Sequence, residues 1–126
     1  GLAGLSLREV ARRAGVTHQA PYHHFGDRET ILAELVAEGF AELAGRLESA
    51  LARATTARDA LGGSFEAYVG FAVDRPGVFR IMFRPELCDP QRFPRAQAAG
   101  DRAYAALQAM VQRLHGADDA AQSLAS

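Results

Sequence analysis

Apolar residues recur three or four positions apart along most of the chain, which is the spacing of amphipathic helices. The longest stripe follows Asp27 and predicts one helix of about two dozen residues. Its apolar positions are Ile31, Leu32, Leu35, Val36, Phe40, Leu43, Leu47 and Leu51. The acidic residues mostly off this stripe are predicted to form a solvated face, and they are Glu34, Glu38, Glu42 and Glu48.

Two further helices are predicted after a junction at Thr55 and Thr56. The first covers residues 57–74, and its apolar face consists of Leu61, Phe65, Tyr68, Val69 and Ala72. The second covers residues 96–115, and its apolar face consists of Ala103, Leu107, Met110, Val111 and Leu114. Gly116 is expected to end this second helix, and Asp118 to cap one more.

A short and very apolar run occupies residues 78–83, shortly after Pro76. By length it fits a buried strand, but no other segment would pair with it, so a short buried helix is predicted. Pro85, Pro90 and Pro94 predict a loop between this run and the last long helix. The fold class expected from the whole pattern is therefore all-α.

Residues 6–25 have the pattern of two short helices joined by a tight turn. Ser6 and Glu9 form a capping box for the first helix, and Gly15 stands where a left-handed residue ends it. Thr17 is a good N-cap for the second helix. Two such helices make a helix-turn-helix. The second helix exposes His, Gln and Tyr rather than Glu and Lys, which favours a DNA reader over a plain helical hairpin.

The chain has 126 residues, of which 48% are hydrophobic and 23% charged. It is expected to divide into a DNA-binding domain at residues 1–46 and a helical effector-binding and dimerisation domain at residues 47–126. The first 28 residues hold four arginines against two acids, a mild electrostatic footprint for DNA. The single Cys88 fits a reducing cytoplasm, and no apolar run approaches the roughly 20 residues of a membrane span. A cytoplasmic protein without a membrane partner is expected.

Residues 5–17, Leu-Ser-Leu-Arg-Glu-Val-Ala-Arg-Arg-Ala-Gly-Val-Thr, resemble the tetracycline-repressor (TetR) family of bacterial regulators. The resemblance continues in Tyr-His-His-Phe at residues 22–25 and Asp-Arg-Glu at residues 27–29. Residues 67–72 and 75–83 are similar to the ligand domain of one subgroup, which usually carries Trp-His-Gly further on. The resemblance implies a dimeric repressor that binds an operator in double-stranded DNA and responds to a small apolar or amphipathic effector.

The resemblance also implies roles for residues of the helix-turn-helix. Those placed to contact base edges are Arg8, His18, Gln19 and Ala20. Those placed to grip phosphates are Ser6, Thr17, Tyr22, His23, His24 and Arg28. His24 has an alternative role as a packed histidine that bonds the backbone.

Aromatic and sulfur-containing side chains gather in the second half of the chain. They are either a helical core or the wall of an effector pocket between helices, in which Tyr68 and Arg80 would be polar fixtures. The predicted pocket residues are Phe65, Tyr68, Val69, Phe79, Arg80, Met82, Phe83, Leu107, Met110 and Val111.

The sequence predicts no enzyme, no metal site and no cofactor. The histidines lack metal-ligand spacing, Cys88 has no partner cysteine or histidine nearby, and no Gly-rich phosphate loop is present. The alternative to a DNA-binding regulator is a helical small-molecule-binding or protein-interaction module that does not use DNA.

The family comparison also suggests that the 126 residues are truncated at both ends. A family member has one more helix before the position of Gly1. It forms its dimer with its last two helices, and residues 116–126 would supply only the first turns of one of them. A homodimer with most of its interface beyond Ser126 is therefore expected. Residues 96–115 should then keep an under-covered apolar edge near Leu107, Val111 and Leu114.

Overall fold

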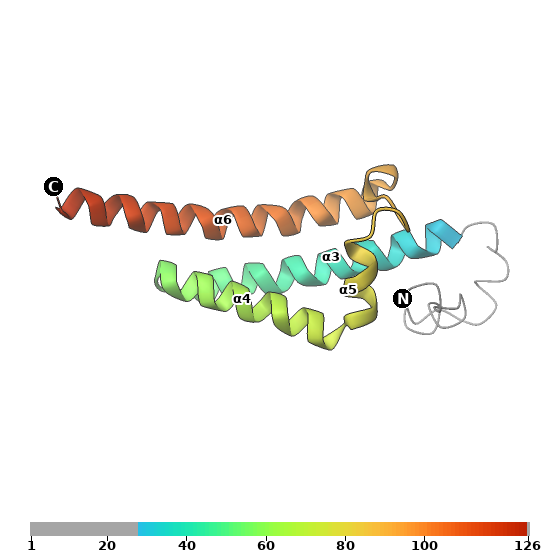
Figure 1. Cartoon of the computed structure of the whole chain (residues 1–126), viewed down its shortest axis with the longest axis horizontal. Helices are drawn as coiled ribbons and strands as arrows, with labels where there is room; N and C mark the ends of the chain where they lie inside the picture. The colour runs from blue at the N-terminus through green and yellow to red at the C-terminus, as the bar shows by residue number, and fades with distance from the viewer. Residues whose placement is uncertain (1–27, 126) are drawn as a thin grey trace.

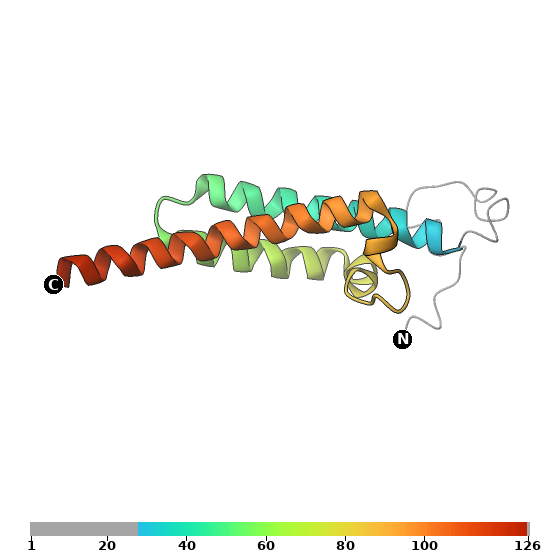
Figure 2. The ribbon, with the colours of Figure 1, turned by 90° about the horizontal axis from the view of Figure 1, so that it is seen from above.

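The computed structural model describes residues 28–125, and in this part of the chain the structure is all-α. Three long helices, α3 (Arg28–Arg53), α4 (Ala57–Asp74) and α6 (Pro94–Ala125), follow the long axis of the molecule (Figure 1). The short helix α5 (Pro76–Met82) crosses near one end, and a 3₁₀ turn, η3 (Pro90–Arg92), precedes α6. Seen from above, α6 lies over α3 and α4 and runs on past both (Figure 2).

Local signals account for where α4 and α5 begin. The Thr56 hydroxyl accepts a hydrogen bond from the backbone N–H of Asp59 at 3.0 Å, which caps the first turn of α4. Pro76 opens α5 at a position where its missing N–H costs nothing. The predicted helix at residues 57–74 is confirmed, and so is a short helix in place of a strand before residue 83.

The predicted helix end at Gly116 is wrong, because α6 continues through this residue to Ala125. A glycine inside a helix costs only about 1 kcal/mol relative to alanine, whereas ending the helix would release several backbone hydrogen bonds. The predicted loop before α6 is also shorter than expected. Pro94 is the first residue of α6, and η3 occupies Pro90–Arg92.

The buried core lies where α3 meets α4, α5 and α6. Its largest fully buried side chains include Val36, Leu43 and Leu47 of α3 and Phe71 of α4. The α3 side chains belong to the apolar stripe that predicted this helix, so that stripe does face the core.

The apolar face predicted for α4 is only partly the face that this helix buries, since Tyr68 packs against the core. Leu61, Phe65 and Val69 are exposed, whereas Ala60, Ser64 and Phe71 are buried. The small residues let α4 approach α3 closely, as the position of Gly63 shows: a Cβ there would lie 3.4 Å from the Ala50 Cβ. Helix α4 therefore packs its small residues closely against α3 and leaves the larger side chains of its other face exposed.

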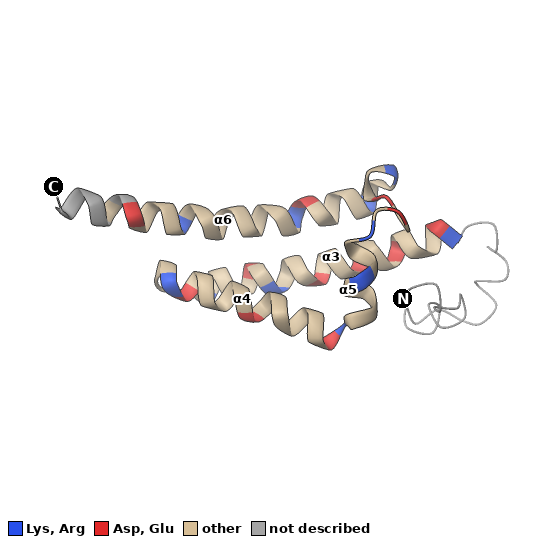
Figure 3. Ribbon diagram, viewed as in Figure 1, with Lys and Arg blue, Asp and Glu red and all other residues tan. Residues whose placement is uncertain are grey.

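Ion pairs connect α6 and η3 to the glutamates of α3. Arg92 donates to Glu29 at 2.8 Å, Arg95 donates to Glu34 at 2.6 Å, and Arg102 makes two hydrogen bonds to the Glu48 carboxylate. Charges of both signs are interspersed along the helices (Figure 3). Because these pairs are exposed to solvent, they contribute little to stability and are weakened by salt.

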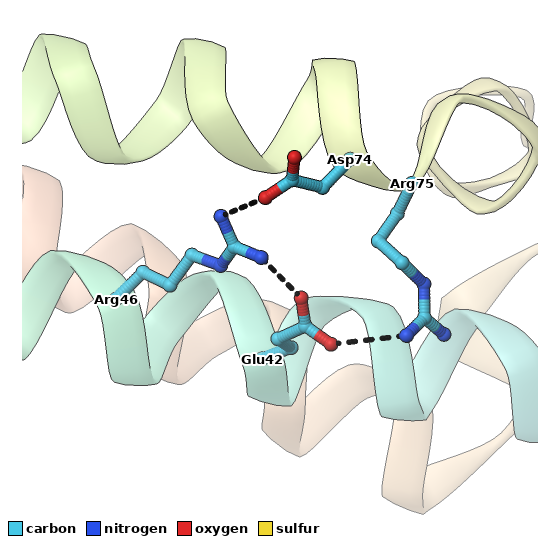
Figure 4. A network of polar contacts seen from close by, with 4 residues as sticks. All are labelled: Glu42, Arg46, Asp74 and Arg75. Carbon is cyan, nitrogen blue, oxygen red and sulfur yellow. Dashed lines mark hydrogen bonds and ion pairs between the residues drawn. The ribbon is translucent and has the colours of Figure 1, made fainter.

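A second polar network joins α3 to the corner between α4 and α5 (Figure 4). Arg46 donates to Asp74 and to Glu42, both at 3.0 Å, and Arg75 donates to Glu42 at 3.3 Å. The Arg46 guanidinium also lies 5.6 Å from the centre of the Phe71 ring. The network therefore joins the corner to the middle of α3. The pKa of Arg46 is raised, chiefly by its hydrogen bond to Asp74.

Gly39 marks the closest approach of α3 and α5, and it supplies a first prediction. A Cβ at this position would lie 2.6 Å from Met82 Sδ and 2.6 Å from Val78 Cγ1. Overpacking of this kind costs about 1–3 kcal/mol. The Gly39→Ala variant should therefore be less stable than the natural protein in urea unfolding, despite the better helix propensity of alanine.

The matched control for this prediction is Gly62→Ala, since a Cβ at Gly62 of α4 meets no described atom within 4 Å. That variant should gain roughly 0.5–1 kcal/mol from helix propensity alone. Equal gains for both variants would contradict the close approach of α5 at Gly39.

Candidate effector pocket

A hollow of about 440 Å³ lies between α3, α4, α6 and the segment that connects α5 to η3. This volume is within the range of about 300–1,000 Å³ that is typical of small-molecule sites. The lining residues before α6 are Phe40, Leu43, Tyr68, Phe83, Pro85, Asp89, Pro90 and Gln91. The lining residues on α6 are Ala96, Gln97, Gly100, Asp101, Ala103, Tyr104 and Leu107.

Small residues on α6 leave the space open. One face of α6 carries residues four and three positions apart, namely Ala96, Gly100 and Ala103. This face lines the hollow. A Cβ on Gly100 would first meet the Phe40 ring, at 3.9 Å, which is ordinary contact distance. Larger side chains at these positions would fill the hollow.

The opposite wall is aromatic and internally packed. Phe40 meets Phe83 edge to face, with ring centres 5.5 Å apart and planes at 75°. Tyr68 meets Phe79 at 5.5 Å and 86°, and Phe79 lies 5.1 Å from Phe83. Each such pair adds about 0.5–1.5 kcal/mol beyond the area it buries, so the rings hold one another in place.

Polar groups lie at the part of the hollow nearest η3 and the start of α6. Asp89 Oδ1 accepts a hydrogen bond from the Gln91 backbone N–H at 3.0 Å, which caps η3. Asp101 Oδ1 accepts from Gln97 Nε2, also at 3.0 Å. The hollow thus combines a large apolar surface with a few polar side chains, the composition of a ligand site.

Three of the ten residues predicted for an effector pocket line this hollow: Tyr68, Phe83 and Leu107. Phe79 packs behind the aromatic wall, and Met82 is buried against α3 near Gly39.

The other five predicted pocket residues lie outside the hollow. Phe65 and Val69 are on the exposed outer face of α4, and Arg80 is exposed on α5. Met110 and Val111 lie further along α6.

Sequence reasoning overlooked most of the residues that shape the hollow. It assigned Phe40 to the core stripe of α3, and it gave no role to Asp89 or Asp101. The spacing of small residues at positions 96, 100 and 103 was a usable signal, because a helix face without bulk opposite several aromatic residues leaves space.

The predicted DNA-contacting residues, apart from Arg28, lie outside the described residues. They are Ser6, Arg8, Thr17, His18, Gln19, Ala20, Tyr22, His23 and His24. Arg28 is the first residue of α3 and is exposed.

Two apolar surfaces of the described helices are open to solvent. On α4, four apolar side chains spaced four residues apart are 41% to 71% exposed, and they are Leu61, Phe65, Val69 and Val73. On α6, Val111 is 42% exposed, between the half-buried Leu107 and Leu114. The under-covered edge predicted for α6 is therefore confirmed, and α4 carries a longer one that was not predicted.

Cys88 lies in the connection next to Asp89 and is 2% exposed. Burial is the main cause that raises the pKa of its thiol, and the charges of Glu29 and Asp89 raise it further. A thiol held protonated in this way is a poor nucleophile. Among the described residues no group of three potential metal ligands comes together, and none of the helices there has a stretch apolar and long enough to span a bilayer.

Long helices around an apolar hollow place the described residues among all-α helical domains. The comparisons with known proteins identify the family. Residues 61–125 match the tetracycline-repressor-like C-terminal domain. Residues 1–35 match the N-terminal domain of bacterial regulatory proteins of the tetR family. The chain belongs to the TetR family of transcriptional regulators. Its likeness to the Trp-His-Gly subgroup stays a prediction.

Two relatives give the extent of the likeness. An uncharacterised HTH-type transcriptional regulator of Haemophilus influenzae is 31% identical over 96 residues, which are 76% of this chain and 47% of that protein. The crystal structure of the TetR family transcriptional regulator PfmR from Thermus thermophilus superposes with a TM-score of 0.66 at 27% identity. That superposition covers 90% of this chain and 62% of PfmR. The chain therefore spans about half the length of the Haemophilus relative.

Proposed function

We propose that this chain reads an operator in double-stranded DNA and senses a small effector, as part of a dimeric transcriptional repressor. One observation carries the proposal. Helix α3 follows the helix-turn-helix motif of residues 6–25 directly in sequence, and the same helix supplies Phe40 and Leu43 to the hollow. With 26 residues, α3 is about 39 Å long at ~1.5 Å per residue. A single stiff element thus connects the DNA-reading part of the sequence to the effector site.

The effector would act by preferring one of two positions of α3. A ligand shifts such an equilibrium only if it binds the two states with different affinity. The composition of the hollow supports such a mechanism, because its walls come from different elements, Phe40 from α3 and Gly100 from α6. A ligand between them would favour the separation of α3 and α6 that fits its own thickness, and DNA would favour another.

A dimer supplies the affinity that one reader lacks. A single small reading module buries only roughly 600–1,000 Å² of protein surface on DNA. Two copies related by two-fold symmetry would place their reading helices on half-sites about 34–36 Å apart. The operator should accordingly be an inverted repeat.

The second prediction distinguishes residues that contact base edges from residues that contact phosphates. Tyr22→Phe removes one hydroxyl proposed to bond a phosphate, so binding should weaken by about 1 kcal/mol on every duplex alike. Gln19→Ala removes a side chain proposed to bond adenine, so about 1–3 kcal/mol of preference should disappear at one base position only. Fluorescence anisotropy with the operator and its single-base variants measures both effects.

The roles are reversed if the Tyr22 variant loses preference at one position while the Gln19 variant weakens on all duplexes. Arg113→Gln is a suitable control, because Arg113 donates to the Leu51 carbonyl oxygen within the helical body. Its DNA affinity should match that of the natural protein.

The experiment that tests the proposal is a titration of duplex DNA into the natural protein at two salt concentrations. Each phosphate contact should lower log K by about 0.9 per unit of log salt concentration. A steep salt dependence together with a preference for one sequence supports the regulator. Absence of binding at low salt would instead favour a helical ligand-binding or interaction module that does not use DNA.

A further inference from the structure

The charges that line the hollow all have one sign. Among the described residues, only Asp89, from the segment before η3, and Asp101, from α6, line it with a charge at neutral pH. No arginine of residues 28–125 lines the hollow, although 14 arginines are present in the chain. An effector that enters the hollow therefore meets negative charge and no compensating cation from this part of the chain.

The arginines nearest in sequence to the lining residues bond elsewhere. Arg92 and Arg95 donate to Glu29 and Glu34 of α3. Arg102 follows Asp101 in the sequence but does not line the hollow, and it donates to Glu48 instead. Their charges are matched by these glutamates on the outer surface, so they do little to offset the two aspartates.

Both aspartates are positioned by hydrogen bonds that use only one carboxylate oxygen. Asp89 Oδ1 caps η3, and Asp101 Oδ1 accepts from Gln97 Nε2. Neither aspartate has an ion-pair partner in the part of the chain that the structure describes. A carboxylate beside an apolar surface is stabilised by a cation more strongly than by a neutral hydrogen-bond donor.

The aromatic lining favours the same sign of ligand charge. Four aromatic residues line the hollow, and they are Phe40, Tyr68, Phe83 and Tyr104. Aromatic faces are electron-rich, and they attract a cation that lies within about 6 Å of a ring centre. An anion in the same place would meet repulsion from the rings and from both aspartates.

We propose that the effector is an amphipathic organic cation, with an apolar or aromatic body and one quaternary or protonated amine. The body would lie against Phe40, Leu43 and Leu107, and the cation toward Asp89 and Asp101. This inference rests on the proposed function of the hollow as the effector site, and it adds the sign of the ligand charge.

Three probes with one aromatic body test the charge preference: naphthylmethyl-trimethylammonium, naphthylmethanol and naphthalenesulfonate. Isothermal titration calorimetry with the natural protein gives the affinity of each. The cation should bind at least about tenfold more tightly than the neutral alcohol, because the two carboxylates attract positive charge and the aromatic rings add to this preference. The sulfonate should bind most weakly.

The double variant Asp89→Asn with Asp101→Asn removes both charges and keeps the shape of the side chains. Asparagine at position 89 still offers an oxygen to cap η3. The ratio of cation to alcohol affinity should fall about tenfold in this variant, while the affinity for the alcohol stays the same. The control variant Glu38→Gln with Asp118→Asn changes the net charge equally at two exposed residues outside the hollow. Its affinity ratio should not change.

The outcomes separate this inference from the proposed function. If the alcohol binds as tightly as the cation, or the double variant keeps the affinity ratio, the charge preference is wrong and the hollow remains a ligand site. If none of the three probes binds at the highest concentration at which it is soluble, the hollow is not a ligand site. The proposed charge preference is then wrong as well.

Discussion

Replacing Phe71 with alanine should lower the free energy of unfolding by about 3–5 kcal/mol, the usual cost of removing a fully buried aromatic side chain. Phe71 is 0% exposed and lies where α4 faces α3 and α5. Its ring centre is 6.3 Å from that of Phe79, and the Arg46 guanidinium lies over it. The deletion would leave a cavity among elements that ion pairs hold in place, so the site could not easily collapse.

Phe65→Ala is the matched control, because it makes the same change on the same helix. Phe65 is 69% exposed, and surface substitutions usually change stability by less than about 0.5 kcal/mol. Urea unfolding of both variants, followed by circular dichroism, measures the difference. If the Phe65 variant lost as much stability as the Phe71 variant, the orientation of α4 would be wrong.

Gly100→Leu should reduce effector binding by at least about tenfold without unfolding the protein. A leucine at this position of α6 would project toward the Phe40 ring and occupy part of the 440 Å³ hollow. The helix itself should tolerate the change, because leucine is a better helix former than glycine by up to roughly 1 kcal/mol. Calorimetry with naphthylmethyl-trimethylammonium measures the loss of affinity, and thermal unfolding shows that the fold remains.

Gly116→Leu is the control for the Gly100→Leu prediction. Gly116 is on the same helix, but a Cβ there meets no described atom within 4 Å, and the residue does not line the hollow. This variant should bind the probe as the natural protein does. Unchanged binding by the Gly100 variant would mean that the effector occupies another site.

The helices could be predicted from sequence wherever a local signal determines them. The cap at Thr56 begins α4, Pro76 begins α5, and the apolar stripe of α3 faces the core as expected. Gly116 carries a helix-ending signal, but whether a helix stops at a glycine depends on the residues beyond it. Here the residues after Gly116 continue the helix.

The orientation of α4 and the position of the hollow were harder to predict, because both depend on how closely helices pack. Helix α4 has large apolar residues such as Phe65 on one face and small residues such as Ala60 and Ser64 on another. Hydrophobicity alone favours burying Phe65, yet the fold buries the small face so that α4 can approach α3. The hollow likewise lies beside small residues of α6, whereas bulky side chains had indicated the pocket.

The cross-helix ion pairs were outside the reach of sequence patterns for a similar reason. Glu34 and Glu48 were predicted to be solvated, and they do lie at the surface. Their partners, Arg95 and Arg102, are 61 and 54 residues away in the chain. Which exposed charges meet is decided by the relative rotation of α3 and α6, and helical periodicity does not specify that rotation.

Binding-site selection from random double-stranded DNA with the natural protein tests the central claim, that this chain belongs to a dimeric reader of a specific operator. The selected sequences should converge on an inverted repeat with half-sites about 34–36 Å apart, roughly one helical turn. Addition of an effector that occupies the hollow should release the selected DNA. Recovery of random sequence after repeated rounds, with no repeat enriched, would contradict the account.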